Sequence, residues 1–334
     1  IFFDPMMYAL GADTTNIELV RGYGLCYTVS APLFIFSSSL QSFIRNDKSP
    51  RHAMIAVLTG SGLNILLDYL FIFVFKMGMF GASFATSIGT SITVCILVIH
   101  FFTKKNTMRF SFRFFSIKAL WEIAKCGFSS FLIECANAVL VFVFNHTLLK
   151  YIGSVGVTVY SIMSNVAVVC MSLFNGVTLA AQPIIATNHG ADNHKRVLQV
   201  RHIGTITSSV IAVIIFCVGF FFPDLLIYSY VNSPTPEILE LARYALRIYF
   251  FAYLFMNFNI FFSGYFQSTL RPVAAITIQI LRSLLLSSVL VSVLPMIFGA
   301  DAIWYAVPIT ECITFFVAMA FLFFGRFKKT KDAK

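Results

Sequence analysis

The sequence predicts an all-α integral membrane protein, and composition is the first reason. Hydrophobic residues make up 58% of the chain and charged residues only 11%, whereas about 25% of the residues in a typical soluble domain are charged. The apolar runs are about 20 residues or longer, which is enough for a helix to cross ~30 Å of hydrocarbon. They do not alternate in polarity as the strands of a membrane barrel do. The expected surroundings of the chain are therefore a lipid bilayer, and its expected form is helical.

Nine apolar segments are predicted to span the membrane, because each is long enough for one crossing. In chain order they cover residues 21–44, 52–75, 80–102, 119–149, 156–187, 202–222, 241–268, 273–295 and 301–324. The seven cysteines lie singly in apolar runs, without the close pairing of a metal site. No metal is expected.

Basic residues lie in alternate connections between these spans. Because cytoplasmic loops carry an excess of Lys and Arg, those connections and the C-terminus are predicted to be cytoplasmic. The other connections contain acidic residues such as Asp13 and Glu237 and few cations. This pattern accounts for the net charge of +10 without a nucleic-acid partner. The basic groups are Arg45 to Arg51, Lys104 to Lys118, Lys195 to Arg201, Arg271, and Arg326 to Lys334.

The chain contains two copies of one sequence pattern. Tyr23–Pro50 matches Tyr244–Pro272 in length and in its closing basic and proline residues, and Phe80-Gly81-Ala82 corresponds to Phe298-Gly299-Ala300. One copy corresponds to six helices, and an even number of helices returns the chain to the side on which it started. The expected architecture is two six-helix bundles related by a pseudo-two-fold axis along the membrane normal, as in some secondary transporters.

The first copy is expected to be incomplete. Its opening segment, Ile1–Leu25, matches Phe220–Leu246, which follows the third helix of the second copy. We therefore expect about nine of twelve helices in this chain. The expected domains are an incomplete first bundle at 1–102, a cytoplasmic linker at 103–118, a second bundle at 119–325 and a basic cytoplasmic tail at 326–334.

Five segments resemble those of the multidrug and toxic compound extrusion (MATE) transporters, and the resemblance covers nearly the whole chain. They are the turn from Arg45 to Pro50, NILLDYLFIF from Asn64, MGMFGASFATSIG from Met77, AAQPIIATNHGADNHKRV from Ala180 and YFQSTLRP from Tyr265. The resemblance implies a twelve-helix protein of two lobes. It also implies export of cationic amphipathic compounds in exchange for sodium ions or protons, without a cofactor, by a monomer in a bacterial plasma membrane.

Asp68 is an ionisable residue inside a predicted span, where a charge costs at least ~2.5 to 3.5 kcal/mol at the centre. It follows Asn64 by four residues, so both point from one helix face. A count of ~1.5 Å per residue places Asp68 and Thr86 of the next span at similar depth. Their oxygen atoms suit a hard cation; alternatively, Asp68 carries a proton, or Asn64 and Asp68 only bond each other or the backbone. The resemblance places all three residues at a cation site, although the family's Asp on helix one is absent here.

Glu134 lies at nearly the same depth in the second bundle, about 22 Å from the cytoplasmic end of its helix. It resembles an acid that some MATE branches use for cation coupling or substrate binding. Those branches pair it with an Asp on helix ten, where this chain has Asn257 and Asn259. Glu134, with Asn257 and Asn259, is therefore a candidate for substrate or proton coupling, in which Glu134 is a substrate counter-charge or proton carrier; a buried acid bonded to Asn137 or a Ser is the alternative.

Arg282 and Glu311 both fall near the middle of the membrane and are predicted to pair. A buried ion pair of this kind requires close geometry and is expected to be structural. Asn165, Ser172, Asn175 and Gln182 are expected either to line an inter-lobe cavity or to serve as helix-packing contacts.

The leading functional hypothesis is cation-coupled multidrug efflux by alternating access. The alternative within transport is a lipid-linked saccharide flippase, which requires several cationic side chains in the cavity, whereas only Arg282 lies deep. A membrane-embedded transferase or hydrolase requires clustered His, Asp or Glu, but His146 and His189 are isolated in the sequence. No enzymatic activity and no catalytic residue are expected.

Overall fold

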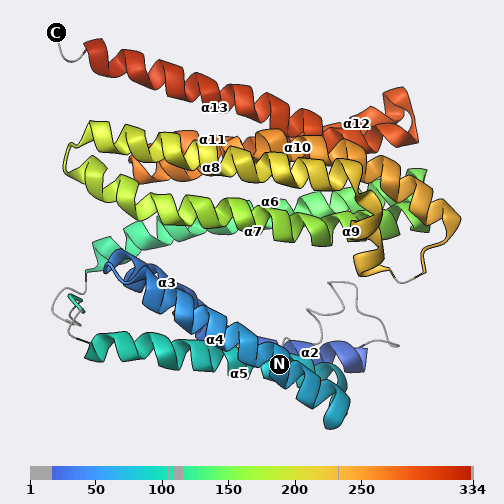
Figure 1. The fold of residues 1–334 in the computed structure, drawn as a ribbon, viewed down its shortest axis with the longest axis horizontal. Helices are drawn as coiled ribbons and strands as arrows, with labels where there is room; N and C mark the ends of the chain where they lie inside the picture. Colours follow the sequence, from blue (N-terminus) through green and yellow to red (C-terminus); the bar gives the residue numbers. More distant parts are fainter. Residues whose placement is uncertain (1–16, 104–105, 109–115, 232, 332–334) are drawn as a thin grey trace. The chain divides into compact units, whose positions relative to one another are not determined.

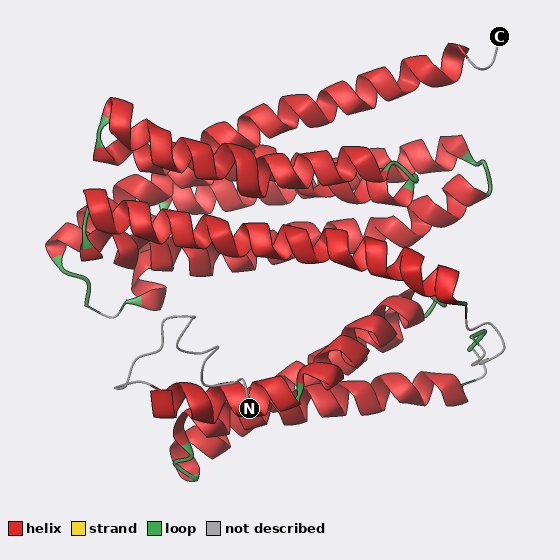
Figure 2. Cartoon of the chain, turned by 180° about the vertical axis from the view of Figure 1, so that it is seen from behind, coloured by secondary structure: helices red, strands yellow, loops and turns green. Residues whose placement is uncertain are grey.

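The computed structural model describes residues 17–103, 106–108, 116–231 and 233–331, with the backbone alone for Leu19, for part of 118–136 and for 324–331. The chain forms two compact units, Ile1–Phe114 (unit 1) and Phe115–Lys334 (unit 2). The boundary falls inside the expected linker, 103–118. All regular structure in the described residues is helical (Figures 1 and 2).

Unit 1 begins with two helices, α2 (Ile17–Val29) and α3 (Ala31–Asn46), where one span at 21–44 was expected. The break lies at Ser30, just before Pro32 in the first turn of α3. Because proline has no backbone N–H and its ring crowds the preceding turn, it ends or kinks a helix. Each of the two pieces is shorter than a membrane-spanning helix.

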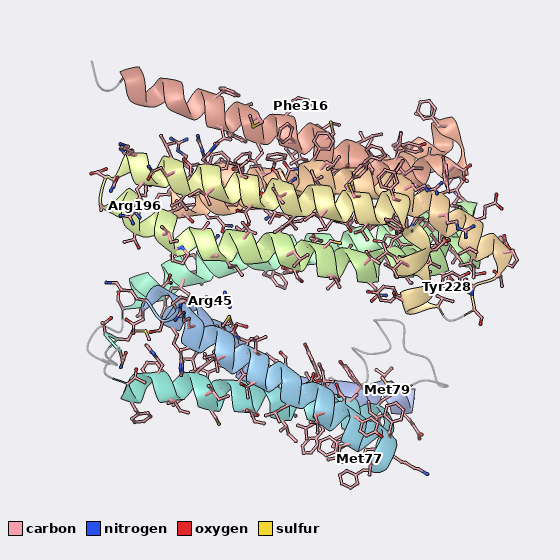
Figure 3. All side chains as sticks on the ribbon, viewed as in Figure 1. Arg45, Met77, Met79, Arg196, Tyr228 and Phe316 are labelled. Carbon is pink, nitrogen blue, oxygen red and sulfur yellow. The ribbon has the colours of Figure 1, made fainter. Side chains whose placement is uncertain are left out.

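The rest of unit 1 is a helix pair. Helix α4 (Pro50–Asp68) continues into a π-helix at Tyr69–Val74, and α5 (Gly78–Ile99) runs back beside it. Arg45 and Met77 lie at opposite ends of this unit (Figure 3).

Glycines bring α4 and α5 unusually close. A Cβ atom on Gly60 of α4 would lie 2.7 Å from the carbonyl oxygen of Gly89 on α5, and one on Gly89 would lie 2.9 Å from Asn64 Cβ. Small residues at an interface of membrane helices allow such backbone contact. The approach holds Asn64 directly against α5.

Unit 2 begins with three long helices and a short one. They are α6 (Ile117–Tyr151), α7 (Ser154–Gly190), α8 (His194–Phe221) and α9 (Pro223–Tyr230). Helix α9 was not expected from the sequence and is too short to cross a bilayer. It packs against α8 and the following helix, α10 (Pro236–Ser268).

The last two spans of unit 2 each change helical type. The first consists of α11 (Pro272–Ile280), a π-helix at Leu281–Leu285 and α12 (Leu286–Phe298). The second starts as a 3₁₀-helix at Ala300–Tyr305 and continues as α13 (Ala306–Lys331). A π-turn inside an α-helix is rare and is frequently found at functional sites.

Among the described residues, seven helices are long and apolar enough to cross a membrane, against nine spans expected. They are Pro50–Val74, Gly78–Phe102, Ser154–Gly190, His194–Phe221, Pro236–Ser268, Pro272–Phe298 and Ala300–Phe323. Of the two remaining expected spans, 21–44 is broken at Ser30, and 119–149 coincides with α6, whose 35 residues include many undescribed side chains. The chain is a multi-pass membrane protein.

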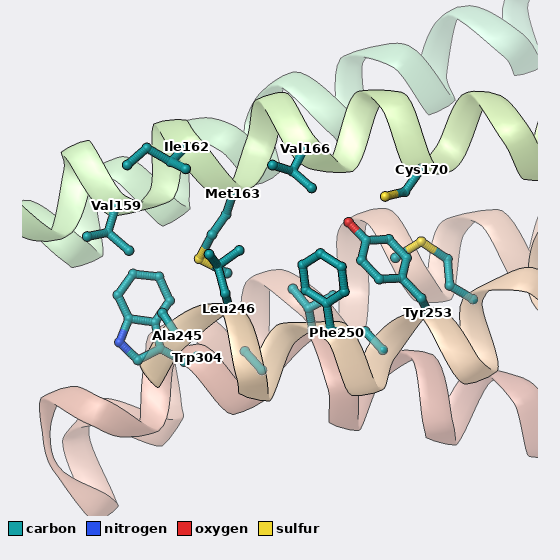
Figure 4. Close-up of a cluster of buried hydrophobic side chains, with 14 of the residues drawn as sticks. Val159, Ile162, Met163, Val166, Cys170, Ala245, Leu246, Phe250, Tyr253 and Trp304 are labelled. Carbon is teal, nitrogen blue, oxygen red and sulfur yellow. The ribbon is translucent and has the colours of Figure 1, made fainter. Parts of the chain in front are cut away.

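The core of unit 2 forms around α10, which contacts α7, α8 and α13. Phe250, Tyr253 and Trp304 are among its largest fully buried side chains, and α7 covers them with residues such as Val159, Ile162 and Val166 (Figure 4). On α8, Gly219 makes room for the Phe250 ring, since a Cβ there would lie 1.9 Å from it. This packing fixes α10, which carries residues of the site described next.

Candidate functional site

Unit 2 contains a cavity of about 660 Å³ between α6, α7, α10, α11–α12 and α13. Its wall combines aromatic and aliphatic surface with many polar side chains, which is unusual inside a membrane bundle and is typical of a substrate site. The polar lining residues are Glu134, Asn137, Tyr160, Ser164, Asn175, Thr178, Gln182, Tyr249, Ser263, Gln267, Gln279, Arg282, Ser283, Ser287 and Glu311.

Glu134 and Asn137 line the cavity from α6 and are exposed in the structure. On the same helix, the Phe144 ring stacks on Tyr160 of α7, with centroids 4.7 Å apart and the planes 4° from parallel. Within the described part of the chain, Glu134 has no hydrogen-bond or ion-pair partner. The alternative bond to Asn137 is not formed, and the free carboxylate of Glu134 lines the same cavity as the Phe144–Tyr160 ring pair.

Arg282 and Glu311 lie side by side in the cavity wall, as their depths predict. Arg282 donates from Nε and Nη2 to Glu311 Oε1, at 3.0 and 2.7 Å. Asn259 Nδ2 donates to Glu311 Oε2 at 2.7 Å and to the Glu311 carbonyl oxygen at 2.9 Å. Both carboxylate oxygens therefore have donors, and the charge of Glu311 is balanced.

The π-helix at Leu281–Leu285 shapes the backbone around Arg282. Ser287 Oγ donates to the Arg282 carbonyl oxygen at 2.6 Å, five residues back along the chain. Ser283 Oγ similarly donates to the Gln279 carbonyl oxygen at 2.7 Å. The wider π-turn frees backbone carbonyl groups, and these hydroxyls satisfy them.

Three further oxygen atoms near Glu311 are buried without a hydrogen-bond donor among the described residues. They are Asn259 Oδ1, Thr310 Oγ1 and Thr314 Oγ1. Most buried polar atoms in proteins have a partner, so each unsatisfied one requires an explanation such as water or a ligand. The helix packing around Glu311, behind the cavity wall, therefore has unused acceptor capacity.

A glycine sets the distance between α7 and α10 at the cavity. A Cβ on Gly264 would lie 2.2 Å from Thr178 Cγ2 and 3.1 Å from Gln182 Nε2. Gln182 Nε2 donates to Gln267 Oε1 at 3.3 Å across the same contact. Of the polar residues expected along α7, Asn175 and Gln182 line the cavity, whereas Asn165 and Ser172 bond backbone carbonyl groups one turn back.

Asn257 has a different environment from Asn259, although both are buried on α10. Its Nδ2 donates to the carbonyl oxygens of Tyr253 and Leu254, and its Oδ1 accepts from Ser208 Oγ of α8 at 3.3 Å. Neither Asn257 nor Asn259 is among the described residues that line the cavity. Asn257 links two helices, and Asn259 holds Glu311.

The three residues expected to form a cation site in unit 1 lie on adjacent helices. Asn64 Nδ2 is 3.5 Å from Thr86 Oγ1, which itself donates to the Ala82 carbonyl oxygen at 3.0 Å. Asp68 is half-buried, and its Oδ1 has no hydrogen-bond partner. Asp68 is also the last α-helical residue before the π-helix at Tyr69–Val74. The site thus contains one acidic oxygen without a donor.

A buried cluster that sequence reasoning missed fixes the start of the linker to unit 1. Asp47 Oδ2 accepts from His100 Nε2 at 2.8 Å and from the Thr107 backbone N–H at 3.1 Å, and Oδ1 accepts from the Thr107 hydroxyl. The Thr107 hydroxyl, then His100 and the Thr107 N–H, lower the pKa of Asp47 from 3.8 to about 2. No spacing rule connects residues 47, 100 and 107, so only the fold reveals them.

A family model described as MatE matches residues 126–293 of this chain, which is half of its length. The chain belongs to the MatE family. Members of this family are transporters and not enzymes. The matched segment contains Glu134, Asn257, Asn259 and Arg282, whereas Glu311 lies beyond it.

Two curated relatives extend the match over almost the whole chain. The multidrug export protein MepA of Staphylococcus saprophyticus is 27% identical over 331 residues, covering 98% of this chain and 72% of MepA. MepA of Staphylococcus haemolyticus is 26% identical over 333 residues, covering 99% of this chain and 73% of the relative.

Solved structures have the same fold. A multidrug resistance MATE family transporter of the MOP superfamily, in an outward-facing conformation, superimposes with a TM-score of 0.88 at 21% identity, covering 98% of this chain and 73% of that protein. A MOP superfamily transporter from Pyrococcus furiosus, described as having a binding pocket of reversed polarity, superimposes with a TM-score of 0.89 at 21% identity. The match covers 99% of this chain and 74% of that protein. At this identity the likeness establishes the fold alone.

Proposed function

We propose that this chain exports cationic, amphipathic compounds across a bacterial plasma membrane by exchanging them for sodium ions or protons. The observation that carries the proposal is the cavity of unit 2, which combines apolar and aromatic surface with an unpaired carboxylate, Glu134. An amphipathic cation has the complementary features, a positive charge and an apolar body. The printed names of the relatives, multidrug export proteins, agree with this reading.

Charge balance within the cavity supports a cationic substrate. Its ionisable wall residues of the Asp, Glu, Lys and Arg types, among those described, are Glu134, Arg282 and Glu311. Because Arg282 and Glu311 neutralise each other, one negative charge remains. An uncompensated carboxylate on the wall of a cavity inside a membrane bundle favours a positive partner. A bound monocation or a proton would neutralise this charge, so the two compete for Glu134.

Exchange requires a second group that responds to the driving ion, and we assign this role to unit 1. Asp68 supplies a carboxylate oxygen without a donor, while Asn64 and Thr86 supply neutral oxygen atoms on the adjacent turn and helix. A sodium ion bound among them, or a proton on Asp68, would neutralise the same charge. Alternating access of two pseudo-symmetric six-helix lobes, acting as a monomer, would then couple this site to the cavity.

The cavity does not favour a lipid-linked saccharide flippase. Pyrophosphate carries several negative charges and requires several free cations, and Arg is the side chain best suited to hold it. Arg282 is the one Arg or Lys among the described lining residues, and its guanidinium is bound to Glu311. A polyanion would have to displace that carboxylate.

Ethidium binding tests the proposal directly. The protein, expressed from its complete reading frame and purified in detergent, is titrated with ethidium while ligand fluorescence anisotropy is followed. Glu134→Gln should weaken binding at least about tenfold, since the variant removes the one unpaired charge of the cavity and leaves its shape. Glu237→Gln, which removes an exposed carboxylate outside the cavity, is the matched control and should bind as the wild type does. Equal affinity of the Glu134→Gln variant and the wild type would refute the role of Glu134.

A further inference from the structure

A groove at one end of unit 2 lies outside the cavity described above. It has a volume of about 200 Å³ and lies between α8, α10 and α13. Arg201, His202 and Thr205 of α8 line one side. Phe262 of α10 and Met319 and Leu322 of α13 line the other.

The groove has a basic rim and an apolar floor. Arg201 lies over the Tyr265 ring, 5.7 Å from its centroid, and has no carboxylate partner among the described residues. His202 is exposed beside it, and the groove has no acidic lining residue in the described part of the chain. A cation held on an aromatic face keeps its N–H donors available for an anion. The rim is therefore suited to an anionic group.

The depth of the rim matches the headgroup region of a bilayer. Helix α8 has 28 residues, which is ~42 Å and exceeds the ~30 Å hydrocarbon core. Arg201 follows the start of α8, His194, by seven residues, which is ~10 Å. Arg196 marks the same end of the helix in Figure 3. This end also contains Lys195, so it is the basic, expected cytoplasmic side.

We propose that this groove binds one anionic phospholipid of the cytoplasmic leaflet. Arg201 and His202 bind the headgroup phosphate, and one acyl chain lies along Phe262, Met319 and Leu322. Basic pockets between membrane helices on the cytoplasmic side are suited to anionic headgroups, and each Arg near the surface contributes about fivefold in affinity. The apolar floor distinguishes a lipid from a soluble phosphate, which would leave Met319 and Leu322 uncovered. The inference does not depend on the transported substrate or on the coupling ion.

Native mass spectrometry provides the test. The protein, expressed from its complete reading frame and purified in detergent, is mixed with phosphatidylglycerol or with phosphatidylcholine of the same acyl chains. Wild-type protein should retain more phosphatidylglycerol than phosphatidylcholine. Arg201→Gln should lower its retention about fivefold, whereas Arg196→Gln, an equal charge change on an exposed residue outside the groove, should not.

A second variant blocks the floor without changing any charge. Met319→Trp should reduce retention of phosphatidylglycerol to the level of phosphatidylcholine, with a melting temperature in detergent that verifies folding. The proposal is overturned by equal retention of the two lipids in the wild type. It is also overturned by equal losses in Arg201→Gln and Arg196→Gln, which would mean a diffuse attraction of the basic face, or by unchanged retention in folded Met319→Trp.

Discussion

Glu311 is a buried carboxylate whose two oxygen atoms both accept hydrogen bonds. Its side chain is 4% exposed, and three N–H donors from Arg282 and Asn259 reach its carboxylate. Replacement of one partner of such a pair leaves the other charge buried and unbalanced. We therefore expect Glu311→Gln to lower the free energy of unfolding by about 3 to 5 kcal/mol.

Thermal unfolding in detergent measures this loss. The double variant Arg282→Gln/Glu311→Gln removes both charges and should recover most of the lost stability. Glu134→Gln, which removes an acid without an ion-pair partner, should unfold close to the wild-type temperature. A wild-type melting temperature for Glu311→Gln would mean that the pair has no structural role.

The lowered pKa of Asp47 predicts that the stability of the folded protein depends on pH. Its pKa is lowered to about 2 in the folded protein from 3.8, so the folded state binds fewer protons than the unfolded state between these values. The stability that Asp47 contributes is present above pH ~4 and is lost as pH falls through about 2.

Unfolding by urea, followed by circular dichroism from pH 7 to pH 2, should show this loss in the wild type. Asp47→Asn should be less stable than the wild type at pH 7, and the gap should narrow toward pH 2. A constant difference across this range would contradict the assignment.

The partners of Arg282, Asn259 and Asp47 differ in how far the sequence predicts them. Depth along a helix follows from counting residues, which is why Arg282 and Glu311 could be expected to meet. The count does not reveal rotation about the helix axis or the packing of a third helix. Asn259, two residues from Asn257, therefore could not be assigned to Glu311 in advance, nor could Thr107 be assigned to Asp47.

At the scale of helices, α4 and α5 depend on two facing glycines. Gly89→Ala would place a methyl group 2.9 Å from both Asn64 Cβ and the Gly60 carbonyl oxygen. Helix backbones cannot yield as a flexible side chain can, so we expect a loss of about 1 to 3 kcal/mol. Gly62→Ala on α4 is the control, because nothing lies within 4 Å of its added Cβ. The melting temperatures of the two variants measure the difference, and equal values would contradict close packing of α4 on α5.

Helix positions were largely predictable, whereas helix type was not. Apolar runs of sufficient length gave the positions of α4, α5 and the long helices of unit 2. The break at Ser30 was missed because the apolar pattern continues through it, although Pro32 provided a local signal. The π-helices at Tyr69–Val74 and Leu281–Leu285 have no comparable signal, since they depend on which side chains satisfy the freed carbonyl groups.

At the scale of the molecule, orientation remains a prediction from charge. Reporter fusions after Met108 and at Lys334 should both report a cytoplasmic location, and a fusion after Pro236 should report the outer side. The reason is the excess of Lys and Arg in alternate connections. A reversed location for any one of the three would mean that one expected span does not cross the membrane.

In the proposed function, an ion gradient drives export through the charge of Asp68. Ethidium export from vesicles that contain the protein expressed from its complete reading frame, with either a sodium or a proton gradient imposed, measures this coupling. Asp68→Asn is compared with Asp301→Asn, which removes an exposed carboxylate from unit 2. An amide is easier to bury than a charge, so Asp68→Asn should insert and fold normally.

We predict that wild-type protein and Asp301→Asn export ethidium under one of the two gradients and that Asp68→Asn exports none. Export driven by sodium alone would favour an ion bound by Asn64, Asp68 and Thr86, and export driven by protons alone would favour protonation of Asp68. Full export by Asp68→Asn under either gradient would contradict a coupling role for Asp68.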